Sequence, residues 1–161
     1  MTYTQNVPSW LDIAIKLTPA FVTLVVGSFG VCIAFNQYRV SRDKLRLDLF
    51  DKRITAYEKL QEYFICVLRE GRVKDDALPI LAEARYKSFF LFGSDITDYI
   101  DEIWSSAIKH RKLHLKLYGS NSLPVGEERN KVCDEETKLL EWIITQQTDS
   151  PNRYLKYMRF Q

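Results

Sequence analysis

The sequence lacks the short motifs through which many enzymes bind phosphate or metal. It contains no GxGxxG or GxxxxGK[ST] glycine pattern, no HExxH and no CxxC pair. Gly27 and Gly30 are close together, but they lie in an apolar run where no phosphate would bind. These absences predict a non-enzymatic protein with no catalytic residues, no cofactor, no metal site and no small-molecule substrate.

Glycine and proline are also scarce, with six and five residues in a chain of 161. Long stretches without either residue favour long helices over a turn-rich β fold. The net charge of +2 is close to balance, so the sequence gives no reason to expect nucleic acid binding. The composition therefore predicts an all-α protein.

Only three cysteines occur, Cys32, Cys66 and Cys133. An odd number at wide spacing predicts no disulfide framework. We expect reduced, packed thiols in a reducing compartment.

Only two histidines occur, His110 and His114, four residues apart on a predicted helix. Two imidazoles at this spacing can hold zinc if a third ligand, such as Cys133 or a glutamate, joins them. Against this, four surrounding bases would repel a cation: Lys109, Arg111, Lys112 and Lys116. The pattern favours an exposed basic helix end over a metal site.

The strongest positive signal is an uncharged apolar run from Leu17 to Asn36. A helix of this length spans about 30 Å, which matches the hydrocarbon core of a bilayer. Pro19 is expected in its first turn, where the missing N–H costs little.

A signal peptide would need more basic residues ahead of the run than Lys16 alone. A core helix with no polar face is uncommon in so small a domain. The run predicts a transmembrane helix over 17–36.

The flanking charges predict the orientation of that helix. Six bases follow the run closely: Arg39, Arg42, Lys44, Arg46, Lys52 and Arg53. The positive-inside rule then places residues 1–16 on the extracytoplasmic side and residues 37–161 in the cytoplasm of a bacterium, with a single pass through the inner membrane.

Small residues recur along the transmembrane segment at spacings of three and four. They are Ala20, Thr23, Gly27, Gly30 and Ala34, named here the small-residue stripe. Such a stripe lets another membrane helix approach closely. It predicts a helix–helix interface and a homo-oligomer.

The rest of the chain carries helical spacing of apolar residues. We expect the first helix to continue through 37–69 and stop at Gly71, with inward residues Leu47, Phe50, Ile54, Tyr57, Leu60, Phe64, Val67 and Leu68. A buried central helix is expected over 78–92. A third helix is expected to be capped by Ser94 or Asp95 and to end at Gly119, and a fourth is expected over 127–147, where Ser150-Pro151 ends it. The prediction is an antiparallel bundle of about four helices, continuous with the transmembrane helix.

The C-terminal tail, residues 152–161, is aromatic and basic and contains no acid. Arg153, Lys156 and Arg159 could contact an anionic bilayer surface. Alternatively, the aromatic residues pack back onto the bundle, which avoids leaving large apolar groups in water.

Some stretches also resemble a known group. Residues 44–53 read KLRLDLFDKR and are followed by Ala56-Tyr57-Glu58-Lys59, and residues 154–160 read YLKYMRF. The chain resembles an uncharacterised group of small bacterial proteins with one N-terminal membrane helix. The resemblance implies an inner-membrane setting and no functional residues.

Three functions remain open at this level. The first is a membrane-tethered module or scaffold that binds a protein partner or itself. The second is an oligomerising membrane-active effector, toxin-like or of the phage-defence kind, although the segment lacks the ionisable residues that commonly mark ion pathways. The third is an enzyme with a dispersed site. A deep pocket with clustered carboxylates would favour the enzyme, and an apolar groove would favour the module.

Overall fold

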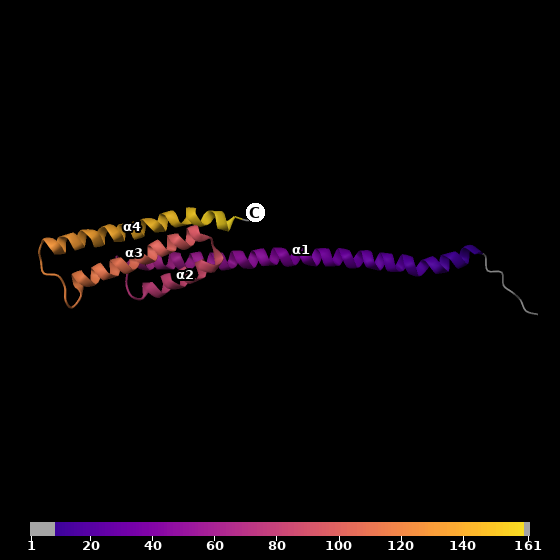
Figure 1. The fold of residues 1–161 in the computed structure, drawn as a ribbon, viewed down its shortest axis with the longest axis horizontal. Coiled ribbons are helices and arrows are strands. Elements are labelled where there is room, and N and C mark those ends of the chain that lie inside the picture. The colour runs from indigo at the N-terminus through magenta and orange to yellow at the C-terminus, as the bar shows by residue number, and fades with distance from the viewer. Residues whose placement is uncertain (1–8, 160–161) are drawn as a thin grey trace, which may run out of the picture. The chain divides into compact units, whose positions relative to one another are not determined.

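The protein is all-α. The computed structural model describes the backbone of residues 9–159 and the side chains of Pro19 and residues 21–159. Four helices follow one another over this range, with bounds α1 Ser9–Glu70, α2 Ala77–Leu91, α3 Ser94–Tyr118 and α4 Glu127–Met158 (Figure 1). The prediction of an all-α protein with about four helices is confirmed.

The chain divides into two compact units, one ending at Leu47 and one beginning at Asp48. The first unit contains the long apolar part of α1. That helix begins at Ser9, so the expectation that Pro19 lies in its first turn is wrong. Thr23 Oγ1 donates a hydrogen bond to the Pro19 carbonyl oxygen at 2.7 Å.

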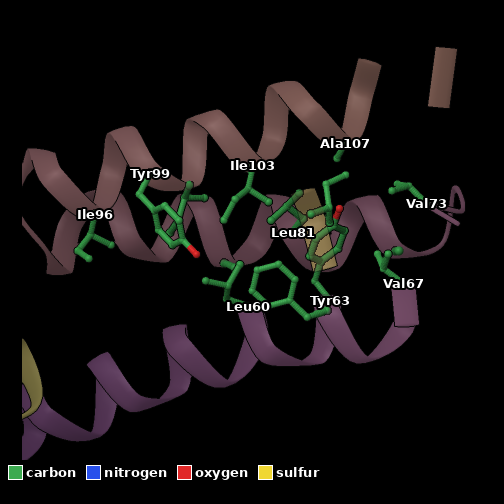
Figure 2. Close-up of a cluster of buried hydrophobic side chains, with 14 of the residues drawn as sticks. Leu60, Tyr63, Val67, Val73, Leu81, Ile96, Tyr99, Ile103 and Ala107 are labelled. Carbon is green, nitrogen blue, oxygen red and sulfur yellow. The ribbon is translucent and has the colours of Figure 1, made fainter. Parts of the chain in front are cut away.

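The second unit, named here the helical domain, has one hydrophobic core between the later part of α1 and the three other helices (Figure 2). Its buried apolar residues recur at three-four spacing, so each helix turns one stripe inward. They are Leu60, Tyr63, Phe64 and Val67 of α1, Val73, Ala77, Leu81 and Ala84 around α2, Ile96, Tyr99, Ile100, Ile103 and Ala107 of α3, and Ile143 and Tyr154 of α4. Burying one such large side chain stabilises the fold by about 1.5–3 kcal/mol.

Two residues that were expected in the core of α1 are exposed. The exposed fraction is 52% for Leu47 and 41% for Leu68. Tyr63 and Ala56 are completely buried instead. The inward stripe of α1 is therefore rotated slightly from the predicted one.

Glycines end or flank the helices largely as the spacing predicts. Gly71 follows α1 with a φ of 63°, the left-handed conformation in which glycine is favoured. The expectation that Ser94 or Asp95 caps α3 is wrong, because Gly93 occupies that position and no side chain caps it. Thr97 Oγ1 instead donates to the Gly93 carbonyl oxygen at 2.9 Å.

The prediction that Ser150-Pro151 ends the last helix is also wrong, since α4 continues to Met158. Proline cannot donate to the carbonyl four residues earlier, which is that of Gln147. Ser150 Oγ donates to this carbonyl oxygen at 3.1 Å, and Gln61 Nε2 of α1 donates to Ser150 Oγ at 2.7 Å. The serine replaces the missing donor, and the packing against α1 holds the helix in place beyond the proline.

The prediction that α2 is a buried central helix is wrong for one of its faces. Its buried residues are Ala77, Leu81, Ala84 and Ser88, which are mostly small and let the helix pack closely. Tyr86, Phe89 and Phe90 point away from the core and are exposed. Three large aromatic side chains therefore lie on the surface of the helical domain.

Candidate interaction surfaces

The three exposed rings of α2 form one continuous surface, named here the aromatic face. The exposed fractions of Tyr86, Phe89 and Phe90 are 69%, 65% and 67%. The rings of Tyr86 and Phe90 meet edge-on at 5.3 Å, and those of Phe89 and Phe90 at 5.1 Å. Edge-to-face contact is a favourable geometry for aromatic rings, so the face is ordered by its own contacts.

A groove runs along each side of the aromatic face. The α3-side groove has a volume of about 730 Å³, and its lining includes Trp104, Arg85, Asp98 and Asp101. The α1-side groove has a volume of about 430 Å³, and its lining includes Asp51, Lys52, Thr55 and Lys87. Tyr86 and Phe90 border both grooves. Apolar grooves of this kind are typical of sites where another protein or helix binds.

Some of the charges beside the grooves are paired within the helical domain. Arg85 donates to Asp101 at 2.5 Å, and this bond raises the pKa of the Arg85 guanidinium. Lys87 contacts Glu83 at 2.6 Å, and this bond lowers the pKa of the Glu83 carboxyl. These four groups are therefore less available to a ligand than their neighbours.

The two grooves carry opposite net charge. One base and two acids line the α3-side groove, whereas two bases and one acid line the α1-side groove. Asp98 on the α3 side and Lys52 on the α1 side form no ion pair within the part of the chain that the structure describes. The lining is thus negative by one charge beside α3 and positive by one charge beside α1.

The small-residue stripe lies on the apolar part of α1. Thr23, Gly27, Gly30 and Ala34 are exposed, whereas the side chain of Ala20 lies outside the described residues. A Cβ atom added at Gly27 or Gly30 would meet no other atom within 4 Å. The stripe thus has space for a second helix, and the interface predicted there stays a prediction.

Residues 152–158 of the basic tail form the end of α4. Arg153 lies over the ring of Tyr99 at 4.4 Å, Lys156 contacts Asp95 at 2.8 Å, and Arg159 is exposed. Tyr154 is buried and Tyr157 packs against the core, so aromatic residues of the tail pack onto the bundle, which is one of the two alternatives for this segment. The membrane contact predicted for the three bases stays a prediction.

Sequence reasoning missed a cluster around Arg53 and Tyr157 that ties the ends of the helices together. Arg53 donates to the carbonyl oxygens of Leu91 at 3.1 Å and Tyr157 at 3.3 Å. The Tyr157 hydroxyl donates to Asp95 Oδ1 at 2.6 Å and accepts from the Gly93 N–H at 3.1 Å. No local pattern signals this cluster, because its members are separated by up to 104 positions along the chain.

The histidine pair is not the exposed basic helix end that the charges around it favoured. His110 is completely buried, and its ring stacks on that of His114 with centroids 6.2 Å apart. Glu136 Oε1 of α4 lies 2.7 Å from His114 Nδ1 and 3.7 Å from His110 Nε2. Arg72 donates to His114 Nε2 at 3.1 Å, so Nδ1 of a neutral His114 carries the proton that Glu136 accepts.

Burial gives His110 a pH-dependent effect on stability. Burial lowers the pKa of His110, Glu136 opposes this shift, and His114 adds to it. The unfolded histidine binds a proton at about pH 6.5, whereas the folded one binds it only at lower pH. The free energy of unfolding is therefore expected to fall as the pH drops below about 6.5. Urea unfolding between about pH 7.5 and about pH 5.5 would show a smaller loss in His110→Leu; equal losses in both proteins would contradict the prediction.

The charged pocket beside this pair contains two carboxylates, Asp75 and Asp76, among three bases. It has a volume of about 380 Å³ and is lined by Arg72, Val73, Lys74, Asp75, Asp76, Arg111, His114 and Leu115. Asp75 is bound by Arg111. Among the described side chains, no three of histidine, cysteine, aspartate and glutamate are placed to hold a metal ion.

The cysteines are unpaired, as the spacing predicted. The expectation that they are packed is wrong for two of them, since Cys32 and Cys133 are exposed and only Cys66 is partly buried.

No protein family, curated protein or solved structure matches this chain. Its function must therefore be inferred from its own surfaces. Of these, the aromatic face is the one where large apolar side chains and two grooves occur together.

Proposed function

We propose that this protein is a membrane-tethered, non-enzymatic interaction module of the bacterial inner membrane. Residues 17–36 of α1 cross the bilayer once, with the N-terminus outside. The helical domain lies in the cytoplasm and binds a protein through the aromatic face of α2. The bilayer and this protein are its partners.

The apolar part of α1 supports the tether. Within the described residues, one helix is long and apolar enough to cross a membrane, with a mean hydropathy of 1.5 over an 18-residue window. None of that window is buried inside the protein, as it would be in a core helix. In water this surface would be costly to expose, whereas in lipid it is not, and a helix satisfies its own backbone hydrogen bonds.

The observation that carries the proposed binding function is the exposure of Tyr86, Phe89 and Phe90. The helical domain has a complete core of large side chains without them. Contiguous exposed apolar surface is typical of protein interaction sites, and aromatic residues contribute most of the binding free energy at such sites. The flanking grooves would receive apolar side chains of the bound protein.

Site-specific photo-crosslinking in intact cells tests this function. A photoreactive amino acid in place of Phe89 is expected to give a discrete covalent adduct. The matched control is Ile65, which is also a large exposed apolar residue, with 55% of its surface accessible, but lies outside both grooves. No adduct at position 89, or equal adducts at both positions, would contradict the proposed function.

A further inference from the structure

We propose that the protein bound by the aromatic face is a second copy of this chain, related by a two-fold axis that runs along α2. This inference rests on the proposed function and names its partner. The two α2 helices would then pack parallel to each other, with their aromatic faces in contact.

The shape of the aromatic face supports its contact with the same face of a second copy. A two-fold interface uses the same patch on both copies, so the patch must carry both the projecting groups and the hollows that receive them. Phe89 and Phe90 project from α2, and the grooves lie directly beside them on the same face. The projecting rings of each copy can therefore enter the hollow beside the α2 of the other.

The charges select the direction of the axis. Asp98 lines the negative α3-side groove and Lys52 the positive α1-side groove, so the two lie on opposite sides of the aromatic face. Rotation about an axis along α2 exchanges the two sides and brings Asp98 of each copy opposite Lys52 of the other. Rotation about an axis across α2 would instead bring Asp98 opposite Asp98. Only the first arrangement is electrostatically complementary, and it forms two ion pairs at once.

The tether increases the chance of this contact. Two copies held in one membrane meet at a raised effective concentration, so a modest contact between their helical domains is sufficient for pairing.

Charge reversal in the full-length protein, reconstituted in lipid nanodiscs or detergent, tests the geometry. Asp98→Lys and Lys52→Asp are each expected to weaken dimerisation about tenfold, because each reverses both ion pairs at once. The double variant D98K/K52D restores both pairs with exchanged signs and is expected to return within about threefold of the natural protein. Lys138→Asp, the same change at an exposed position of α4, is the control and should have no effect.

A second variant tests the aromatic contact. Phe90→Asp is expected to weaken dimerisation at least about 30-fold, because a few central aromatic residues carry most of the binding free energy of an interface. Ile65→Asp places the same charge on an exposed apolar position of α1 and should leave the dimer intact. Circular dichroism checks that all variants keep their helix content.

The outcomes separate this inference from the proposed function. The two-fold arrangement is supported if Phe90→Asp weakens the dimer and if the double variant D98K/K52D recovers the dimerisation that each single charge reversal loses. A dimer that responds only to Gly27→Ile and Gly30→Ile would overturn the inference and leave the tether in place. A monomer whose aromatic face crosslinks to a different protein would overturn the inference and support the proposed function. A monomer with no crosslinked protein would overturn both.

Discussion

Replacing Val26 and Phe29 together by arginine is expected to release the protein from the membrane. Both residues lie near the middle of residues 17–36, and they keep 64% and 66% of their surface exposed. An arginine at the centre of a membrane helix costs about 2.5–3.5 kcal/mol, so the pair costs about 6 kcal/mol. The measurement is the fraction of protein that stays in the membrane pellet after alkaline carbonate extraction.

The control is Leu47→Arg, which adds one arginine to the same helix beyond the apolar run. Leu47 is 52% exposed, and its substitution should leave the protein in the pellet. If the natural protein were found folded in the supernatant without detergent, the tether would be disproved. If Val26→Arg/Phe29→Arg stayed in the pellet, the segment would be held there by something other than the bilayer.

The exposed thiol of Cys133 reports on the orientation of the full-length chain. With Cys32 and Cys66 replaced by serine, Cys133 on α4 is the remaining cysteine. A membrane-impermeant maleimide should label it only after the inner membrane is opened, because we place the helical domain in the cytoplasm. Labelling in intact spheroplasts would reverse the predicted topology and leave the tether itself unaffected.

Substituting Leu60 by alanine is expected to lower the free energy of unfolding of the helical domain by about 2–5 kcal/mol. Leu60 is completely buried and lies on α1, within the core formed with residues of the other three helices. Its loss removes apolar burial and leaves a cavity that the rigid helices fill only in part. A change of this size is a large fraction of the stability of an ordinary domain.

Ile65→Ala is the matched control on the same helix. Ile65 is 55% exposed to solvent, so its truncation should change the free energy of unfolding by less than about 0.5 kcal/mol. Urea unfolding of the full chain in mild detergent, followed by the fluorescence of the partly buried Trp104 and Trp142, measures both variants. Similar losses for the two would show that α1 does not pack as described.

The sequence alone determined the helical class and most helix ends. Glycine and proline are scarce, apolar residues recur every three or four positions, and Gly71 and Gly119 follow the last residues of α1 and α3. These signals are local, because they depend on the backbone conformation and periodicity of a few adjacent residues. The uncharged run from Leu17 to Asn36 is local in the same sense, since length and composition define it.

Only the tertiary structure decided which apolar residues face inward and where the last helix stops. The apolar residues over 78–92 predicted a buried helix, yet mostly small residues of α2 pack inward and three of its rings face outward. The continuation of α4 past Pro151 depends on Gln61, which is 89 positions from Ser150. The burial of His110 and its approach to Glu136 likewise require α3 and α4 to be packed together. Periodicity identifies an apolar stripe, but the contacts that cover it come from other parts of the chain, and their positions are set only when the helices pack.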